Sequence, residues 1–221
     1  MNKVDLSLYG ILDPARSRGR PLPELACAAV AGGATLLQYR DKTGSTRAMV
    51  EAVRAIAAAV AGSGVPLLVN DRVDVALAAG AGGVHVGQDD MAAADARRLL
   101  GPEALIGLSV KTEAEARGSA LEEIDYVCIG GVFDTQSKEN PRSIGVDGWR
   151  ALAAIVRARR PGLPVGAIAG IEVANAGQIM RAGSDGIAVI SALFMAEDVA
   201  AATRRLREIV DGARVAAGES A

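Results

Sequence analysis

The sequence predicts a single (β/α)8 barrel, and three observations carry this prediction. Eight short apolar segments have the length of buried strands, a helical pattern follows each of them, and their starts recur roughly every two to three dozen residues. Polar clusters follow most of these strands, at the end where barrels carry their active sites. A doubly wound open sheet is the alternative, but no dinucleotide-binding fingerprint follows the first strand. We expect one domain over residues 1–221, with a short polar tail from about residue 216.

The composition agrees with such a fold and argues against several classes of protein. Half of the 221 residues are hydrophobic, which is enough for a substantial core, and 26 glycines suit tight turns. A net charge of −2 offers no basic surface for nucleic acid. No apolar run approaches the roughly 18 to 20 residues of a membrane span, and the first residues lack the apolar stretch of a signal peptide. We interpret Cys27 and Cys128, which lie in apolar surroundings without CxxC spacing, as buried, reduced thiols of a cytoplasmic protein.

The first half of the chain is expected to hold four strand–helix units. Pro23 suits the first turn of a helix, Ser45 suits the N-cap of the next, and Gly80 suits the end of the third. The expected strands are 6–12, 34–39, 67–69 and 84–86, and the expected helices are 23–31, 46–61, 73–79 and 92–100.

The second half repeats the pattern with one long loop. Thr112 resembles an N-cap, and Glu115 three residues later completes a capping box. Residues 130–145 form the longest irregular segment, and long ordered loops in compact domains are usually functional. The expected strands are 105–109, 126–129, 164–169 and 186–190, and the expected later helices are 147–159, 172–181 and 197–215.

Two carboxylates follow two consecutive strands. Asp71 comes directly after the third strand, and Asp90 follows the fourth. A parallel crossover brings both strand ends to the same face, so we expect the two side chains in one pocket although they lie 19 residues apart in sequence. Two hard oxygen ligands suit Mg²⁺, which fills its other positions with water and substrate phosphates. Asp89 alternates away from Asp90 and is expected in solvent.

Cationic and polar side chains follow other strands and favour an anion site. Gln38, Arg40 and Lys42 alternate along an extended segment and therefore share one face, where Arg40 suits phosphate oxygens and Lys42 adds a mobile charge. Each of these groups alone also fits an ordinary solvated strand end, and the same holds for Asn70 as a turn residue and Ser109 as a helix-initiating hydroxyl.

A second anion site is expected from the later strand ends. Thr135, Ser137 and Lys138 give the long loop a cluster of donors, which flexible polar loops also carry without a role. Gly170, Ile190 and Ser191 follow the last two strands, where barrels frequently bind a phosphate through backbone amides.

His85, the single histidine, lies within the fourth strand between two valines. No serine or cysteine has an evident histidine partner, so hydrolysis by a triad is not expected, and we interpret His85 as a packed residue behind the site.

Six segments, taken together and in order, resemble the thiamine-phosphate synthase family over residues 8 to 193. They are Q-Y-R-D-K at 38–42, V-N-D at 69–71, G-V-H-V-G-Q-D-D at 83–90, G-L-S-V at 107–110, T-Q-S-K at 135–138 and A-V-I-S-A at 188–192. The resemblance implies a (β/α)8 barrel that joins 4-amino-2-methyl-5-hydroxymethylpyrimidine diphosphate to 4-methyl-5-hydroxyethylthiazole phosphate, or to its carboxylated form. The products would be thiamine phosphate and diphosphate, and the reaction a magnesium-dependent alkyl transfer.

The resemblance also implies roles for individual residues. Asp71 and Asp90 would bind Mg²⁺, and Arg40 and Lys138 would act in catalysis. The pyrimidine diphosphate would be bound by Gln38, Arg40, Lys42, Asn70, Ser109 and Lys138, and the thiazole phosphate by Thr135, Ser137, Gly170, Ile190 and Ser191. This chain has Asp134 where the family usually has a proline, and Ala169 and Gly170 where it has paired glycines.

Two other functions remain open from the sequence. A thiazole tautomerase on the same barrel needs one phosphate site and an acid or base but no diphosphate clamp, and a noncatalytic barrel would bind thiazole phosphate or thiamine phosphate without turnover. The expected partners are small molecules, with neither nucleic acid nor membrane, and assembly into a homo-oligomer is compatible with all three functions.

Overall fold

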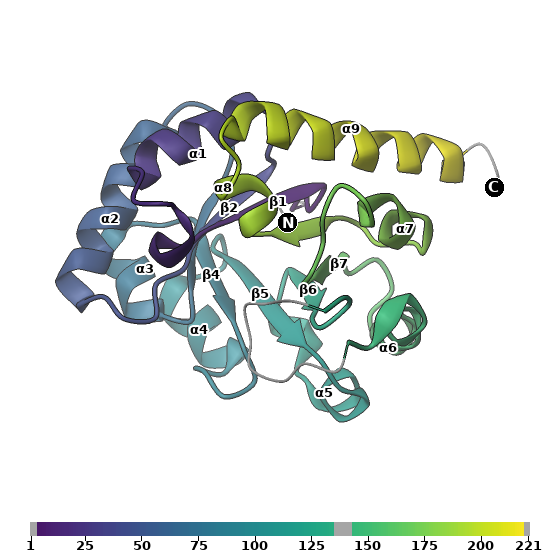
Figure 1. The fold of residues 1–221 in the computed structure, drawn as a ribbon. Coiled ribbons are helices and arrows are strands. Elements are labelled where there is room, and N and C mark those ends of the chain that lie inside the picture. Colours follow the sequence, from purple (N-terminus) through teal and green to yellow (C-terminus); the bar gives the residue numbers. More distant parts are fainter. Residues whose placement is uncertain (1–3, 135–142, 219–221) are drawn as a thin grey trace.

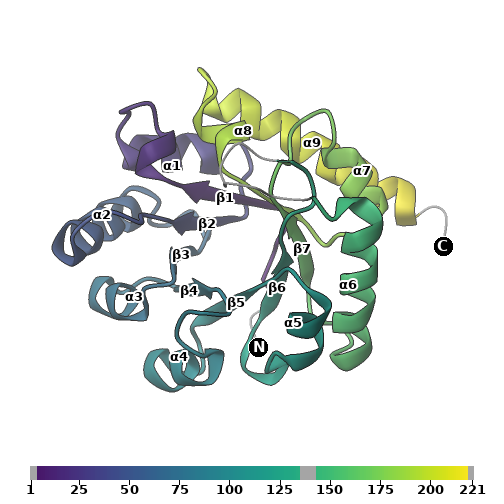
Figure 2. The ribbon, with the colours of Figure 1, turned by 60° about the horizontal axis from the view of Figure 1, so that its bottom comes forward.

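The computed structural model describes residues 4–134 and 143–218, and its eight strands form a closed parallel barrel (Figures 1 and 2). The first strand pairs with both the second and the last, so the sheet has no edges. The strands are β1 (Leu8–Leu12), β2 (Leu36–Tyr39), β3 (Leu67–Asn70), β4 (Gly83–Val86), β5 (Leu105–Val110), β6 (Tyr126–Ile129), β7 (Val165–Ile168) and β8 (Ile187–Val189). The predicted barrel is confirmed, and the open sheet is excluded because such a sheet has two edge strands.

Helices surround the barrel, as the view in Figure 2 shows. They are α1 (Leu22–Ala31), α2 (Thr46–Ala59), α3 (Val73–Ala79), α4 (Ala93–Leu100), α5 (Glu113–Gly118), α6 (Gly145–Arg159), α7 (Ala176–Arg181), α8 (Ser191–Phe194) and α9 (Val199–Gly218), with short 3₁₀ turns at Pro14–Arg16 and Leu121–Glu123. None of these helices is long and apolar enough to span a bilayer, within the residues that the structure describes.

The predicted caps form, and two predicted helices differ. Ser45 accepts a hydrogen bond from the Ala48 amide at 3.3 Å, and Thr112 accepts one from the Glu115 amide at 3.2 Å. Helix α7 begins four residues later than expected because Asn175 holds residues 171–175 in a turn, accepting from the Glu172 amide at 2.8 Å. The final predicted helix, 197–215, corresponds to α9, and the short α8 before it was not predicted.

Apolar side chains form two clusters, one between the barrel and its helices and one inside the barrel. Cys128 belongs to the inner cluster and is buried, as expected. The prediction for Cys27 is wrong, because this thiol is exposed. Leu25, Ala26 and Ala29 face the core from α1, which turns the intervening Cys27 to the other side of the helix, where its thiol lies 3.3 Å from the Ala59 carbonyl oxygen.

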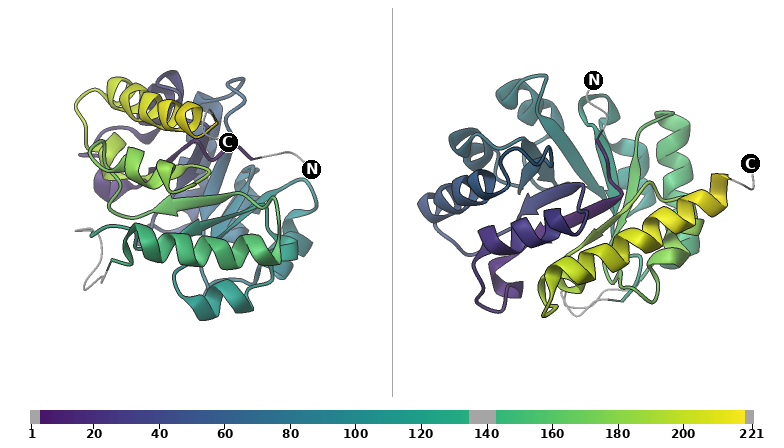
Figure 3. Two further views of the ribbon diagram at one scale, coloured as in Figure 1. Left: turned by 90° about the vertical axis from the view of Figure 1, so that its right-hand side faces the viewer. Right: turned by 90° about the horizontal axis from the view of Figure 1, so that it is seen from above.

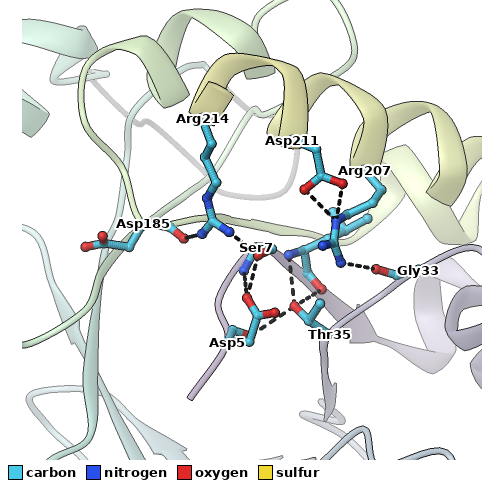
Figure 4. A network of polar contacts seen from close by, with 9 residues as sticks. Asp5, Ser7, Gly33, Thr35, Asp185, Arg207, Asp211 and Arg214 are labelled. Carbon is cyan, nitrogen blue, oxygen red and sulfur yellow. Dashed lines mark hydrogen bonds and ion pairs between the residues drawn. The ribbon is translucent and has the colours of Figure 1, made fainter. Parts of the chain in front are cut away.

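Helix α9 lies along the outside of the barrel between α1 and α7, and its C-terminal part reaches the amino ends of β1 and β8 (Figure 3). Arg214 donates to the Ser7 hydroxyl and to the carbonyl of Asp185, and thereby connects the entry of β1 with the entry of β8 (Figure 4). Arg207 donates to the Gly33 carbonyl at 3.2 Å and pairs with Asp211 on its own helix at 2.8 Å. The last described helix is thus bonded to the residues that precede β1 and β2.

Candidate active site

A pocket of about 1070 Å³ opens at the carboxyl ends of the strands. Its lining includes every predicted site residue that the structure describes: Gln38, Arg40, Lys42, Asn70, Asp71, Asp90, Ser109, Gly170, Ile190 and Ser191. The remaining three, Thr135, Ser137 and Lys138, lie outside the described residues. The expectation that Asp71 and Asp90 share one pocket is confirmed, because β3 and β4 are parallel neighbours.

The end of β2 delivers two cations, each held by a carboxylate. Arg40 pairs with Asp13, which follows β1, at 2.5 Å. Lys42 donates to Asp71, which follows β3. Arg40 and Lys42 are 30% and 55% exposed at their side chains, so both ion pairs face the pocket and its solvent. The pairs hold two positive charges on one side of the pocket and leave N–H donors for an anion.

Local backbone geometry and hydrogen bonds position the two predicted metal ligands. Asp71 adopts a left-handed conformation with φ of 61°, and its amide donates to the His85 carbonyl at 2.9 Å. Asp90 accepts from the Gly87 amide at 2.7 Å. Desolvation, and then the neighbouring carboxyl group of Asp71, raise the pKa of Asp90 above its ordinary value.

Such a pair suits a divalent cation. Among the described residues no group of three or more His, Cys, Asp or Glu side chains is arranged to hold a metal ion. Magnesium commonly takes only one or two protein carboxylates, and phosphates and water complete its coordination. The donor chemistry and the mutual repulsion of Asp71 and Asp90 therefore fit magnesium, and its binding stays a prediction.

A row of polar side chains crosses the barrel interior at the floor of the pocket. The Gln38 amide nitrogen donates to the Tyr9 hydroxyl, and the Tyr126 hydroxyl also donates to Tyr9, at 3.0 Å. Tyr126 lies 3.0 Å from Nδ1 of His85, whose Nε2 lies 2.9 Å from the Ser109 hydroxyl. The row thus joins two predicted ligand-binding residues through three that are almost fully buried. His85 is buried, as expected of a packed residue, although its ring also lines the pocket.

Burial fixes the protonation of this row, and one glycine makes room for it. Burial lowers the pKa of His85 to about 4 and raises the pKa of Tyr9 and Tyr126, so the imidazole is neutral and both phenols keep their protons. Gly107 lies between His85 and Tyr126 in register, and a Cβ there would come within 2.1 Å of the tyrosine ring and 2.5 Å of His85 Nδ1. Packing therefore explains why a glycine begins the G-L-S-V segment.

On the opposite side of the pocket, the segments that follow β7 and β8 line it mainly with backbone groups. Ala169 and Gly170 have φ of 88° and 66°, and their carbonyls accept from the Phe133 amide at 3.2 Å and from the Asn175 side chain at 2.8 Å. Within the described chain, the amides of Gly170 and Ser191 donate to no protein acceptor. Free amides beside a positive-φ turn suit an anion, which is the chemistry expected of the second site.

Sequence reasoning missed several residues that line the pocket. Asp13 and Lys111 follow β1 and β5, and the strand-end rule that selected Asp71 applies to them equally. Arg16, from the 3₁₀ turn after β1, adds another cation. Tyr9 had no signal, because an aromatic residue within a strand is typical of a core.

Comparisons with a family model, with curated proteins and with solved structures agree. The family model described as thiamine monophosphate synthase matches residues 8–193. A thiamine-phosphate synthase of Agrobacterium fabrum is 54% identical, covering 96% of this chain and 97% of that protein. One from Chloroflexus aurantiacus is 48% identical and covers 94% of each. Among solved structures, a thiamine phosphate pyrophosphorylase from Pyrococcus furiosus is 38% identical, with a TM-score of 0.82 over 96% of this chain and 98% of that one.

Proposed function

The chain belongs to the thiamine monophosphate synthase family, and we propose that its pocket joins a hydroxymethylpyrimidine diphosphate to a thiazole phosphate with the help of magnesium. The overall activity is that of a transferase that forms thiamine phosphate. The observation that carries the detailed proposal is that two sides of one pocket have unlike linings. One is lined by cations and a carboxylate pair, and the other by free backbone amides.

The diphosphate is assigned to the side formed by β2, β3 and β4. Arg40 and Lys42 offer N–H donors there, and Asn70 lies at the end of β3 beside them. Diphosphate gains negative charge as it leaves the methylene carbon, so fixed cations stabilise the transition state more than the bound substrate. Lys138, outside the described residues, is proposed to add a third cation.

Asp71 and Asp90 are proposed to hold a magnesium ion, which when bound would withdraw negative charge from the leaving diphosphate. Both residues line one pocket from the ends of neighbouring parallel strands, which supports this assignment. Lys42 already neutralises Asp71, so cation and metal would share one carboxylate.

We infer a dissociative alkyl transfer. The bond between the methylene carbon and the diphosphate oxygen breaks with its electron pair leaving on oxygen, and the aminopyrimidine ring spreads the resulting positive charge. The thiazole nitrogen then supplies the electron pair of the new C–N bond. Gln38 and Ser109, at the ends of the buried row, orient the pyrimidine, and positioning of the two substrates replaces a protein nucleophile.

The thiazole phosphate is assigned to the amides that follow β7 and β8. Gly170 and Ser191 offer free amides there, and Thr135 and Ser137 are proposed to add hydroxyls. The site takes the phosphate of either the plain or the carboxylated thiazole. Holding that phosphate apart from the diphosphate sets the direction from which the ring nitrogen approaches.

The test is the release of diphosphate on mixing the protein with both substrates and magnesium, with EDTA and minus-thiazole controls. Release that requires both substrates, stops with EDTA and matches thiamine phosphate mole for mole is expected. Conversion of a thiazole phosphate isomer without diphosphate release would instead indicate a tautomerase. Binding of thiazole phosphate with no turnover would indicate a noncatalytic barrel.

We also infer that the enzyme works in the cytoplasm. The exposed Cys27 and the buried Cys128 are both free thiols, which suits a reducing compartment. Cell fractionation with antibodies tests the location, and light scattering after size exclusion measures whether a homo-oligomer forms.

A further inference from the structure

Helix α8 forms part of the pocket wall, and it is too short to hold its place alone. Ser191 and Ala192 of this helix line the pocket, as does Met195, which follows it. Isolated helices shorter than about 12 residues are marginal in water, so contacts with other parts of the chain must fix α8. Leu193 and Phe194 are fully buried and hold the helix against the barrel. Apolar contacts of this kind are not directional, so they leave the orientation of α8 to its polar contacts.

The carbonyl groups at the end of α8 accept hydrogen bonds from two arginines that precede α1. Arg20 donates through Nη2 to the Phe194 carbonyl at 2.5 Å and through Nη1 to the Ala196 carbonyl at 2.8 Å. Arg18 donates to the intervening Met195 carbonyl at 3.3 Å. Carbonyls at the end of a helix have no partner within that helix, and arginine is a donor that suits them. Two side chains thus bond three consecutive carbonyl groups.

The segment that carries the two arginines is itself held in a tight turn. Arg18 and Gly19 have φ of 54° and 71°, and the Arg20 amide donates to the Ser17 carbonyl at 3.1 Å. Both central residues of the turn are therefore left-handed, as in a type I′ turn. Ser17 is buried, and Nε of Arg20 also donates to its carbonyl, at 3.1 Å. The turn therefore presents the Arg20 guanidinium to α8 in one orientation.

The other end of α8 carries the group to which the thiazole phosphate is assigned. This group is the Ser191 amide, which donates to no acceptor in the described part of the chain. Neither Arg18 nor Arg20 lines the pocket, so an effect of either residue on a substrate must pass through α8. A helix of this length spans only about 6 Å, so a change of direction at its last carbonyls also moves its first amide.

We propose that Arg20 is a positioning residue for the thiazole phosphate site, which holds the end of α8 so that the Ser191 amide points at the phosphate. The identity of that substrate rests on the proposed function, whereas the ordering of α8 by Arg20 does not. Arg18 contributes less, because it makes a single, longer bond from an exposed side chain.

The first experiment measures the order of α8 without any substrate. The Phe194 amide bonds the Ile190 carbonyl at 3.0 Å, and the Met195 amide bonds the Ser191 carbonyl at 3.1 Å. Hydrogen exchange at these two amides reports how often the helix opens. We expect exchange to be about tenfold faster in Arg20→Met than in the wild type, because two hydrogen bonds to α8 are lost. Equal rates would refute the proposal, whether or not the protein turns over any substrate.

The second experiment measures KM for each substrate separately. Arg20→Met keeps an apolar stem but loses every donor, so we expect KM for the thiazole phosphate to rise about five- to tenfold. KM for the pyrimidine diphosphate should stay within about twofold of its wild-type value. Arg20→Lys reaches one carbonyl at a time and should lie between the wild type and Arg20→Met. A smaller fraction of folded protein would lower the rate without changing either KM.

Arg160→Met is the matched control, because Arg160 also donates to two loop carbonyls, those of Leu121 and Ile124, and none of the three residues lines the pocket. Both of its KM values and its exchange rates in α8 should stay within about twofold of the wild type.

The outcomes separate this proposal from the proposed function. An unchanged KM for the thiazole phosphate in folded Arg20→Met would refute the positioning role, and so would an equal rise in both KM values. A wild-type protein that forms no thiamine phosphate would refute the proposed function instead, and hydrogen exchange in α8 would still decide whether Arg20 orders this helix.

Discussion

The ammonium of Lys42 donates to the carboxylate of Asp71, and the two residues follow neighbouring strands of the barrel. The contact bridges the cationic end of β2 and the acidic end of β3. A leaving group bound here meets both a fixed cation and the carboxylate proposed to hold magnesium.

Asp71→Asn should therefore weaken the proposed magnesium site. The amide keeps an oxygen but loses the charge that attracts magnesium, so we expect turnover to fall by about a hundredfold or more and the magnesium concentration at half-maximal rate to rise. Initial rates of diphosphate release over a magnesium series measure both quantities.

Asp89→Asn is the matched control for this change, because Asp89 is exposed and does not line the pocket. Its rates should match the wild type within about twofold. Equal magnesium dependence in the Asp71 and Asp89 variants would contradict the assigned metal site.

His85 should make the folded state sensitive to acid. Its pKa is lowered from 6.5 to about 4 by burial, so the unfolded chain binds more protons between these values, and stability is complete above 6.5 and is lost as the pH falls toward 4. We expect this group to cost about 2 kcal/mol on going from about pH 7.5 to about pH 5.

Urea unfolding followed by the fluorescence of Trp149, the single tryptophan and a buried one, measures this dependence. His85→Gln, whose side chain does not titrate, should lose less stability over the same interval. Parallel losses in the two proteins would assign the acid sensitivity to other groups.

Replacing Ala169 by glycine should stabilise the protein. Its φ of 88° lies in the left-handed region, which costs a residue with a Cβ about 1 kcal/mol or more. Ala169→Gly should therefore raise the melting temperature by about 2 to 4 °C.

Gly170→Ala is the contrasting change at the next position. A Cβ there would lie 2.4 Å from the Asp134 carbonyl oxygen, with φ at 66°, so the melting temperature should fall. Calorimetry of both variants tests the pair, and a stabilising Gly170→Ala would show that the loop before residue 135 moves away freely.

Ser191→Asp should weaken the binding of one substrate only. A carboxylate beside the free amides after β8 repels a phosphate, so we expect KM for the thiazole phosphate to rise about tenfold and KM for the pyrimidine diphosphate to stay unchanged. Ser191→Ala keeps the amide and should have a small effect. A rise in both KM values would contradict the assignment of the thiazole phosphate alone to the amides after β8.

Strand ends were the part of the site that sequence predicted best. Asp71 and Asp90 meet in one pocket because a parallel crossover returns its strands to the same face, a rule that needs only local patterns. The contact between Tyr9 and Tyr126 joins residues 117 positions apart and depends on closure of the whole barrel, so no local pattern announces it.

Short elements were predicted less well for a related reason. Helix α8 has four residues, fewer than two helical turns, so it shows no period of its own. The start of α7 is set by the side chain of Asn175 rather than by apolar spacing. Cys27 has apolar neighbours in sequence, but the turn of the helix directs it outward.

The bond between Arg214 and Ser7 spans 207 positions of the chain, and it bears on how the protein is made. During synthesis β1 emerges long before β8 and α9, so the edge of β1 that pairs with β8 stays open until those segments emerge. An open edge of this kind invites pairing with other chains. Pairing with β8 covers this edge, and Arg214 of α9 holds the entries of the two strands together, so truncations within α9 should reduce the yield of folded protein before they reach any residue of the pocket.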